Sequence, residues 1–253
     1  MHIIPQLETP AGENFINFEE NLIKLINAIE NSGLNGRYKR QDLPGIVLEQ
    51  NFGFNGLILC KDLKERRKNL NIIYAFNMRD KNRISILSDL ITLKQIGVRD
   101  IIISEGVHPL KTVFNSAKPV YDIDVAGLSL ILKKDIVGGI FDGLINNEMQ
   151  GFFNLGVVAG ASTEADGLKI KKLIKIGADK FIINFAAGSP DQNILNFIKS
   201  EKKDILLYIN EQDIKGSLDN FIKSVNKLNL DGVIIKISNE KDNVFMQYID
   251  KHQ

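Results

Sequence analysis

Short apolar runs alternate with longer amphipathic stretches along the whole chain. The runs are too brief for helices and rich in β-branched residues, as buried strands are. We expect eight strands, at residues 2–7, 45–49, 71–76, 100–104, 153–159, 181–185, 205–209 and 232–237. A helical pattern follows each run, with apolar residues three and four positions apart. Such strand-helix alternation predicts a parallel sheet, because parallel neighbours need a crossover between them.

The stretch from residue 71 to residue 106 shows this unit most clearly. Its two strands enclose a helix, and we expect one apolar stripe on that helix to face the sheet: Ile84, Leu87, Leu90, Ile91 and Lys94. We also expect helices over residues 15–31 and from about residue 53 to residue 68. A later helix begins at Thr163, three residues before Asp166, in the pattern of a capping box.

Length and regularity together predict the fold class. The chain has 253 residues, close to the roughly 250 typical of one barrel of eight strand-helix units. We therefore predict a single (β/α)8 TIM barrel domain over residues 1–253. An open doubly wound sheet is the alternative, but the first strand is not followed by the glycine-rich dinucleotide fingerprint of that fold.

Composition narrows the class of partner. The 32 basic and 31 acidic residues balance, so the sequence predicts no nucleic acid partner and no anionic membrane partner. Neither a signal segment nor an apolar run of membrane-spanning length is present, which favours a cytoplasmic protein. The single cysteine, Cys60, lies on the apolar side of a predicted helix, where we expect a buried, inert thiol. The three scattered histidines make a histidine-based metal site improbable.

Polar residues at the carboxyl ends of the strands are the candidates for function, because barrels build their sites there. They are Gln6, Glu8, Glu49, Asn51, Asn77, Arg79, Asp80, Glu105, Asn184, Asn210 and Lys236. For each residue a loop hydrogen bond or a helix cap is the simpler interpretation. Residues 156–160, GVVAG, are a weak phosphate-loop signal at a strand end.

Several motifs in consistent order resemble the methylenetetrahydrofolate reductase family. RDKNR at residues 79–83, followed by SDL at 88–90 and GVRD at 97–100, is similar to the family's RDRNR, SDL and LGIRN run. PVYDID at 119–124, FNLGV at 153–157 and IGADKFIIN at 176–184 resemble later family motifs. The resemblance covers roughly residues 1–190, and the family fold is a (β/α)8 barrel with flavin over the carboxyl ends of the strands.

This resemblance implies a flavin-dependent oxidoreductase of one-carbon metabolism. Its substrate would be 5,10-methylenetetrahydrofolate or a related pterin carrier, its cofactor FAD, and its electron donor a reduced nicotinamide. The implied cofactor-binding residues are Arg79, Asp80, Tyr121, Asp124 and Asp166, and the implied substrate-binding residues are Asn184, Asn77 and Glu105. Glu8 and Gln6 are the candidates for the catalytic position on the first strand.

The sequence departs from the family where flavin chemistry takes place. Gln6 stands where the family has its acid, and an amide cannot supply a proton, whereas Glu8 lies two residues on and shares its face of the strand. Ala75 and Val107 replace residues that contact the flavin, and Asn184 replaces the glutamine that holds the pterin.

These departures leave two alternatives open. One is a non-catalytic folate- or flavin-binding member, acting as a homo-oligomer or as a subunit of a larger complex, with Tyr74, Phe76 or loop side chains filling the strand ends. The other is an unrelated phosphate-binding barrel, which would need backbone amides converging after the seventh and eighth strands; Gly216 and Ser238 give it little support.

Overall fold

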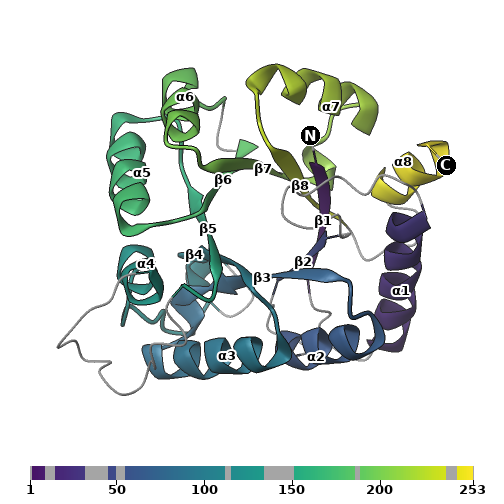
Figure 1. Ribbon diagram of the computed structural model, residues 1–253, viewed down its shortest axis with the longest axis horizontal. Helices are drawn as coiled ribbons and strands as arrows, with labels where there is room; N and C mark the ends of the chain where they lie inside the picture. The colour runs from purple at the N-terminus through teal and green to yellow at the C-terminus, as the bar shows by residue number, and fades with distance from the viewer. Residues whose placement is uncertain are drawn as a thin grey trace.

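Eight parallel strands close into a barrel in the computed structural model (Figure 1), which describes residues 2–8, 15–31, 45–49, 55–111, 115–133, 151–185, 189–237 and 244–252. Strand β1 pairs with β2 on one side and with β8 on the other. Closure confirms the predicted (β/α)8 barrel and shows that the open-sheet alternative is wrong.

All eight strands lie close to their predicted positions. Their bounds are β1 His2–Glu8, β2 Gly45–Glu49, β3 Asn71–Asn77, β4 Asp100–Ser104, β5 Asn154–Ala159, β6 Lys180–Asn184, β7 Asp204–Asn210 and β8 Gly232–Lys236. Each strand is hydrogen-bonded to the next in sequence order, so every crossover joins neighbouring strands.

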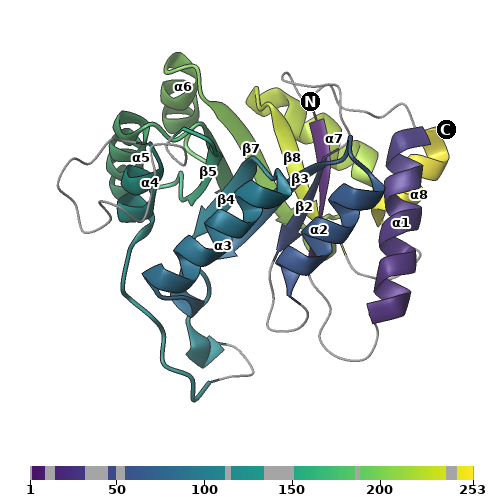
Figure 2. The same cartoon turned by 60° about the horizontal axis from the view of Figure 1, so that its bottom comes forward.

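The helices form an outer ring around the barrel, as Figures 1 and 2 show. Their bounds are α1 Phe15–Asn31, α2 Gly56–Arg66, α3 Arg83–Ile96, α4 Val125–Lys133, α5 Glu164–Ile176, α6 Gln192–Ser200, α7 Leu218–Val225 and α8 Val244–His252. Short 3-10 turns include η1 Met78–Asp80 and η2 Pro109–Lys111. Within the described residues, no helix has the length and apolar character needed to cross a bilayer.

The barrel interior has three levels. A middle level of seven apolar side chains fills the barrel: Ile4, Val47, Ile73, Ile102, Ile182, Leu206 and Ile234. Below it, at the amino ends of the strands, the Lys180 ammonium donates to the Asp100 carboxylate at 2.6 Å. Above it, at the carboxyl ends, the inward residues are polar. The apolar level therefore separates a buried ion pair from a polar opening.

Gly156 makes room for the buried ion pair. It faces inward on β5, between the strands that carry Asp100 and Lys180. A Cβ at this position would lie 3.2 Å from Lys180 Cγ and 2.8 Å from Ile182 Cδ1. Gly156 thus serves packing inside the barrel, so the weak phosphate-loop signal at residues 156–160 has a structural explanation.

The predicted apolar stripe of α3 is partly wrong. Ile84 and Ile91 are 74% and 45% exposed, whereas Leu87 and Leu90 are buried, as predicted. Ile86 and Leu93 complete the buried face in their place. The helix carries apolar residues on two faces, and packing against β3 and β4 selects only one of them.

Candidate active site

Inward side chains at the carboxyl ends of the strands form a polar opening, which we call the barrel mouth. It comprises inward residues at or near the carboxyl ends of seven strands: Gln6, Glu49, Asn77, Ser104, Asn184, Asn210 and Lys236. Some of these residues are direct partners in the strand pairing, as Asn77 on β3 and Ser104 on β4 are. Likewise, Gln6 on β1 pairs with Lys236 on β8, which in turn pairs with Asn210 on β7.

Glu49 lies at the centre of the hydrogen bonds in the barrel mouth. Its Oε2 accepts a hydrogen bond from Gln6 Nε2 at 2.8 Å, and the Lys236 ammonium is 3.7 Å from the same oxygen. Asn77 Nδ2 donates to the other oxygen, Oε1, at 3.5 Å. Three strands other than its own therefore direct a donor group at one carboxylate. The two amides and the ammonium all stabilise its ionised form.

The Asn77 side chain is fixed from the opposite side. Ser104 Oγ on β4 donates to Asn77 Oδ1 at 2.9 Å and also lies 3.2 Å from the Phe76 carbonyl oxygen. Gly106 follows with a φ of +78°, and a Cβ there would lie 3.2 Å from Asn77 Cβ. The positive φ and this close approach both favour glycine at position 106.

A second polar group lies at the end of β7. The Tyr208 hydroxyl donates to Asn210 Oδ1 at 3.3 Å, and Asn210 Nδ2 donates to Asp213 Oδ2 at 3.0 Å. Asn184 is the exposed last residue of β6 and is in register with Tyr208. The candidate pterin partner therefore lies on the β6–β7 side of the mouth.

Charged residues form a rim beside β3, β4 and β5. Glu105 lies between two cations: Lys169 Nζ on α5 donates to it at 2.7 Å, and Arg79 Nη2 is 3.8 Å away. The Arg79 side chain is 20% exposed and that of Lys169 42%. This rim offers two cations to an anionic group, and Glu105 compensates both of them in the present arrangement.

The segment carrying residues 79–83 binds directly to the segment carrying residues 119–124. The Val120 amide donates to the Arg79 carbonyl oxygen at 2.7 Å, and the Arg79 guanidinium lies 5.3 Å from the centre of the Tyr121 ring. Arg83 donates to both Asp122 carboxylate oxygens through its amide, at 2.9 Å, and its Nε, at 2.8 Å. The hydrogen bond with Asp122 raises the pKa of Arg83, and that with Arg83 lowers the pKa of Asp122.

Two of the predicted cofactor residues cap helices. Asp124 Oδ1 accepts the Gly127 amide at 2.6 Å, in the first turn of α4. Asp166 accepts the amides of Ser162 and Thr163, each at 3.0 Å, in the predicted capping box of α5. A Cβ on Gly160 would overlap the Asp166 carboxylate. Burial raises the pKa of Asp166, but these hydrogen bonds outweigh it and hold that pKa below its usual range.

The remaining predicted positions are spread over the mouth and its surroundings. Glu8 pairs in register with Glu49 through the backbone, but the side chains of Glu8 and Asp80, like residues Asn51 and Ser238, lie outside the described part. Ala75 packs on the apolar level inside the barrel, and Val107 is 59% exposed.

Tyr74 and Phe76 do not fill the barrel mouth. Both are buried in the outer cluster between strands and helices, where their rings meet edge to face at 4.9 Å. Burial is the main cause that raises the pKa of the Tyr74 hydroxyl. The strand-end filling expected for a non-catalytic member is therefore not provided by these two rings.

Sequence reasoning left three residues of the site without an assigned role. Glu49 and Lys236 were strand-end candidates, but only closure of the barrel shows that they meet. Lys169 carries no motif and reaches the rim from α5. The signal available for Glu49 was a charged residue ending an otherwise apolar strand, and the same holds for Lys236.

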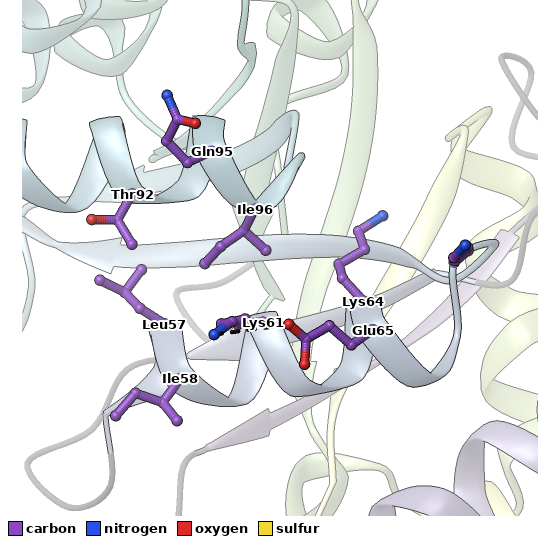
Figure 3. A pocket seen from close by; sticks show the side chains of 9 residues that line it. Leu57, Ile58, Lys61, Lys64, Glu65, Thr92, Gln95 and Ile96 are labelled. Atoms are coloured by element: carbon purple, nitrogen blue, oxygen red, sulfur yellow. Dashed lines mark ion pairs between the residues drawn. The ribbon is translucent and has the colours of Figure 1, made fainter.

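A groove of about 560 Å³ lies on the outer wall between α2 and α3 (Figure 3). Its lining combines the apolar side chains Leu57, Ile58 and Ile96 with Lys61, Lys64, Glu65, Lys68, Thr92 and Gln95. It lies outside the barrel and lacks the convergent hydrogen bonds of the mouth. Nearby, burial raises the pKa of the Cys60 thiol to about 12, which confirms the expected buried, inert cysteine.

Metal chemistry has no support among the described side chains. Within the described ranges, no three His, Cys, Asp or Glu residues are close enough together to hold a metal ion. Among the described side chains, the barrel mouth combines the Glu49 carboxylate, amides, the Ser104 hydroxyl and a lysine, with the Tyr208 hydroxyl beside Asn210. This set can hydrogen-bond a polar heterocycle and move a proton.

Comparisons with solved structures support the fold alone. A mutant tryptophan synthase alpha-subunit from Pyrococcus furiosus superposes with a TM-score of 0.58 at 12% identity, covering 99% of this chain and 95% of that one. An aldolase superposes with a TM-score of 0.57 at 14% identity, covering 99% and 96%. No protein-family model and no curated protein sequence matches the chain.

Proposed function

We propose that this barrel is a flavin-dependent reductase of a one-carbon unit carried by a pterin, similar to methylenetetrahydrofolate reductases. The substrate would be 5,10-methylenetetrahydrofolate or a related pterin carrier, and the product its methyl form. The proposal combines the ordered motifs of the sequence with the polar barrel mouth, since barrels of this class use the carboxyl ends of their strands.

One observation carries the proposal: the two most specific motifs of the resemblance are bound to each other at the rim. Residues 79–83 and 119–124 are about 40 positions apart in sequence, yet Arg79 contacts Val120 and Tyr121, and Arg83 holds Asp122. The two segments follow the neighbouring strands β3 and β4, and these contacts join them into one continuous surface. Their joint placement beside the mouth is what a shared binding surface requires.

The rim residues fit the tail of a dinucleotide such as FAD. Tyr121 is 69% exposed and offers an aromatic face, while Arg79 and Lys169 offer the cations that a diphosphate needs. Asp124 and Asp166 already accept the amides at the starts of α4 and α5. We therefore assign phosphate contacts to the two cations, and contacts with the sugar hydroxyls to the aspartates, which are hydrogen-bond acceptors.

The ring system of the flavin would lie over the inner face of the strands. Ala75 and Ser104 leave space on β3 and β4, because both side chains are small. A bound reduced flavin would supply hydride to the one-carbon unit, with a reduced nicotinamide as its electron donor. The chain's own part is to hold the pterin through Asn77 and Asn184, to orient it, and to exclude water.

An absorption spectrum and one activity measurement test the proposal. We expect purified protein, incubated with FAD and desalted, to keep the visible flavin bands and to reduce 5,10-methylenetetrahydrofolate with a reduced nicotinamide or with chemically reduced flavin. Arg79→Gln should weaken FAD retention, whereas Arg66→Gln, on the outer face of α2, should not. Protein that keeps no flavin and shows no reductase activity would overturn the proposal.

A further inference from the structure

We propose that Glu49 donates the proton that opens the one-carbon ring of the substrate, and that Gln6 is its positioning residue. This inference rests on the proposed function and deepens it. It transfers the acid from the first strand, where an amide now stands, to the neighbouring strand β2.

Gln6 and Glu49 are in direct contact in the barrel mouth. Gln6 lies two residues before the end of β1 and Glu49 is the last residue of the adjacent strand β2, and Gln6 Nε2 lies 2.8 Å from Glu49 Oε2. Gln6 is 6% exposed, and the Glu49 side chain is 20% exposed. The amide is thus buried behind a carboxylate that still reaches the opening. Of the two, Glu49 is the one with access to a substrate in the mouth.

An amide can partner a carboxyl group in both of its protonation states. An ionised carboxylate only accepts hydrogen bonds, whereas a protonated carboxyl also donates one. The amide of Gln6 satisfies either form, because a half-turn of its terminal group presents its oxygen in place of its nitrogen. A glutamine therefore keeps its carboxyl partner in place through a complete cycle of protonation. A second carboxylate there would repel the first.

Two further side chains lie near the Glu49 carboxylate. Asn77 from β3 and the Lys236 ammonium from β8 face it, and both favour the carboxylate while the mouth is filled with water. A flat heterocycle over the mouth would remove that water, which disfavours the charged form. Binding would thus bring a proton onto Glu49, and Lys236 would stabilise the carboxylate that remains after transfer.

The proton transfer begins at the Glu49 carboxyl group. The O–H bond of Glu49 breaks and an N–H bond forms on the bridging nitrogen of the substrate. The ring bond from that nitrogen to the one-carbon unit then opens, leaving an iminium. A flavin held at the rim by Arg79 and Lys169 would supply the hydride that reduces this carbon, and would itself be oxidised. Glu49 recovers its proton from water.

Exchanging the two residues tests the inference. Glu49→Gln should lower kcat by about 100-fold or more, the contribution typical of a general acid. The double variant Gln6→Glu with Glu49→Gln restores one carboxyl and one amide in reversed order, so it should recover much of that loss. Glu201→Gln, an exposed substitution beyond the far end of α6, should keep the wild-type rate.

Infrared difference spectroscopy provides a readout that does not depend on turnover. Adding tetrahydrofolate to the wild-type protein should produce the band of a protonated carboxyl, and Glu49→Gln should lack it while still binding tetrahydrofolate. A wild-type enzyme that is active while Glu49→Gln keeps its full rate would overturn this inference and leave the proposed function standing. A wild-type protein without reductase activity would overturn both.

Discussion

At the scale of single residues, the ion pair between Lys180 and Asp100 is the most deeply buried charge interaction among the described residues. The two side chains are 5% and 10% exposed, and apolar side chains lie directly above them in the barrel. Such a pair adds little to the free energy of unfolding when it is compared with apolar residues of the same volume. Removing one partner, however, leaves the other charge buried without compensation.

We therefore expect Lys180→Met to lower the free energy of unfolding by about 3–5 kcal/mol, because it leaves the Asp100 carboxylate unpaired. The double variant with Asp100→Leu should recover a large part of this loss. Lys199→Met serves as the matched control, since its pair with Asp231 is more exposed, at 25% and 21%. Urea denaturation measures all three, and a double variant no more stable than Lys180→Met would contradict the explanation.

At the scale of elements, Gly156 in β5 and Gly167 in α5 differ in the space available for a larger side chain. A Cβ on Gly156 would lie 2.8 Å from Ile182 Cδ1 and 3.1 Å from Ile102 Cγ1, whereas a Cβ on Gly167 meets nothing closer than 3.8 Å. Gly156 lies inside the packed barrel, and Gly167 lies in a helix, where glycine is unfavourable.

Gly156→Ala should accordingly destabilise the protein by about 1–3 kcal/mol through overpacking. Gly167→Ala should stabilise it by up to about 1 kcal/mol, because alanine has the higher helix propensity. Thermal unfolding of the two variants beside the wild type checks both signs. If Gly156→Ala melted with the wild type, the glycine would not be needed to make room for Lys180.

The capping box of α5 predicts a dependence of stability on pH. The pKa of Asp166 is lower in the folded protein than its usual value, so its contribution is present above about pH 4 and is lost as the pH falls through the folded value. Asp166→Asn should therefore be less stable than the wild type at neutral pH, and the gap should close in acid. Denaturation curves at several pH values would show this, and a gap that stayed constant with pH would exclude the carboxylate as the cause.

Helix α3 shows that apolar periodicity in the sequence does not by itself determine which face of a helix is buried. Ile84 and Ile91 are seven residues apart, as are Ile86 and Leu93, so both pairs can lie on one face of a helix. Only the second pair is buried. The sequence predicted the existence and the approximate bounds of the helix because those depend on local pattern. The choice of face depends on how the helix sits against β3 and β4, and no local pattern contains that.

At the scale of the whole molecule, closure of the barrel is what assembles the candidate site. The alternation of strands and helices was sufficient to predict the barrel, and the rule that sites lie at the carboxyl ends was sufficient to name Gln6, Glu49 and Lys236 as candidates. Their contact was not predictable from spacing, because Glu49 and Lys236 lie on strands at opposite ends of the chain. It follows from the pairing of β8 with β1 and of β1 with β2.

For two predicted cofactor-binding residues, the sequence alone could not distinguish ligand binding from helix capping. Asp124 and Asp166 matched family positions, but a carboxylate at the start of a helix is equally typical of a cap, and both cap helices here. Arg79 and Tyr121 are the stronger candidates for cofactor binding. Their contact brings together two motifs for which the sequence established only the order along the chain.

The most direct test of the central claim is a single-turnover experiment without a nicotinamide. Protein loaded with FAD and reduced chemically would be mixed anaerobically with 5,10-methylenetetrahydrofolate while the flavin absorbance is followed. Oxidation of the flavin together with formation of one equivalent of the methyl product is the result we predict. Protein that holds reduced flavin and binds the folate, but leaves the flavin reduced, would contradict the account.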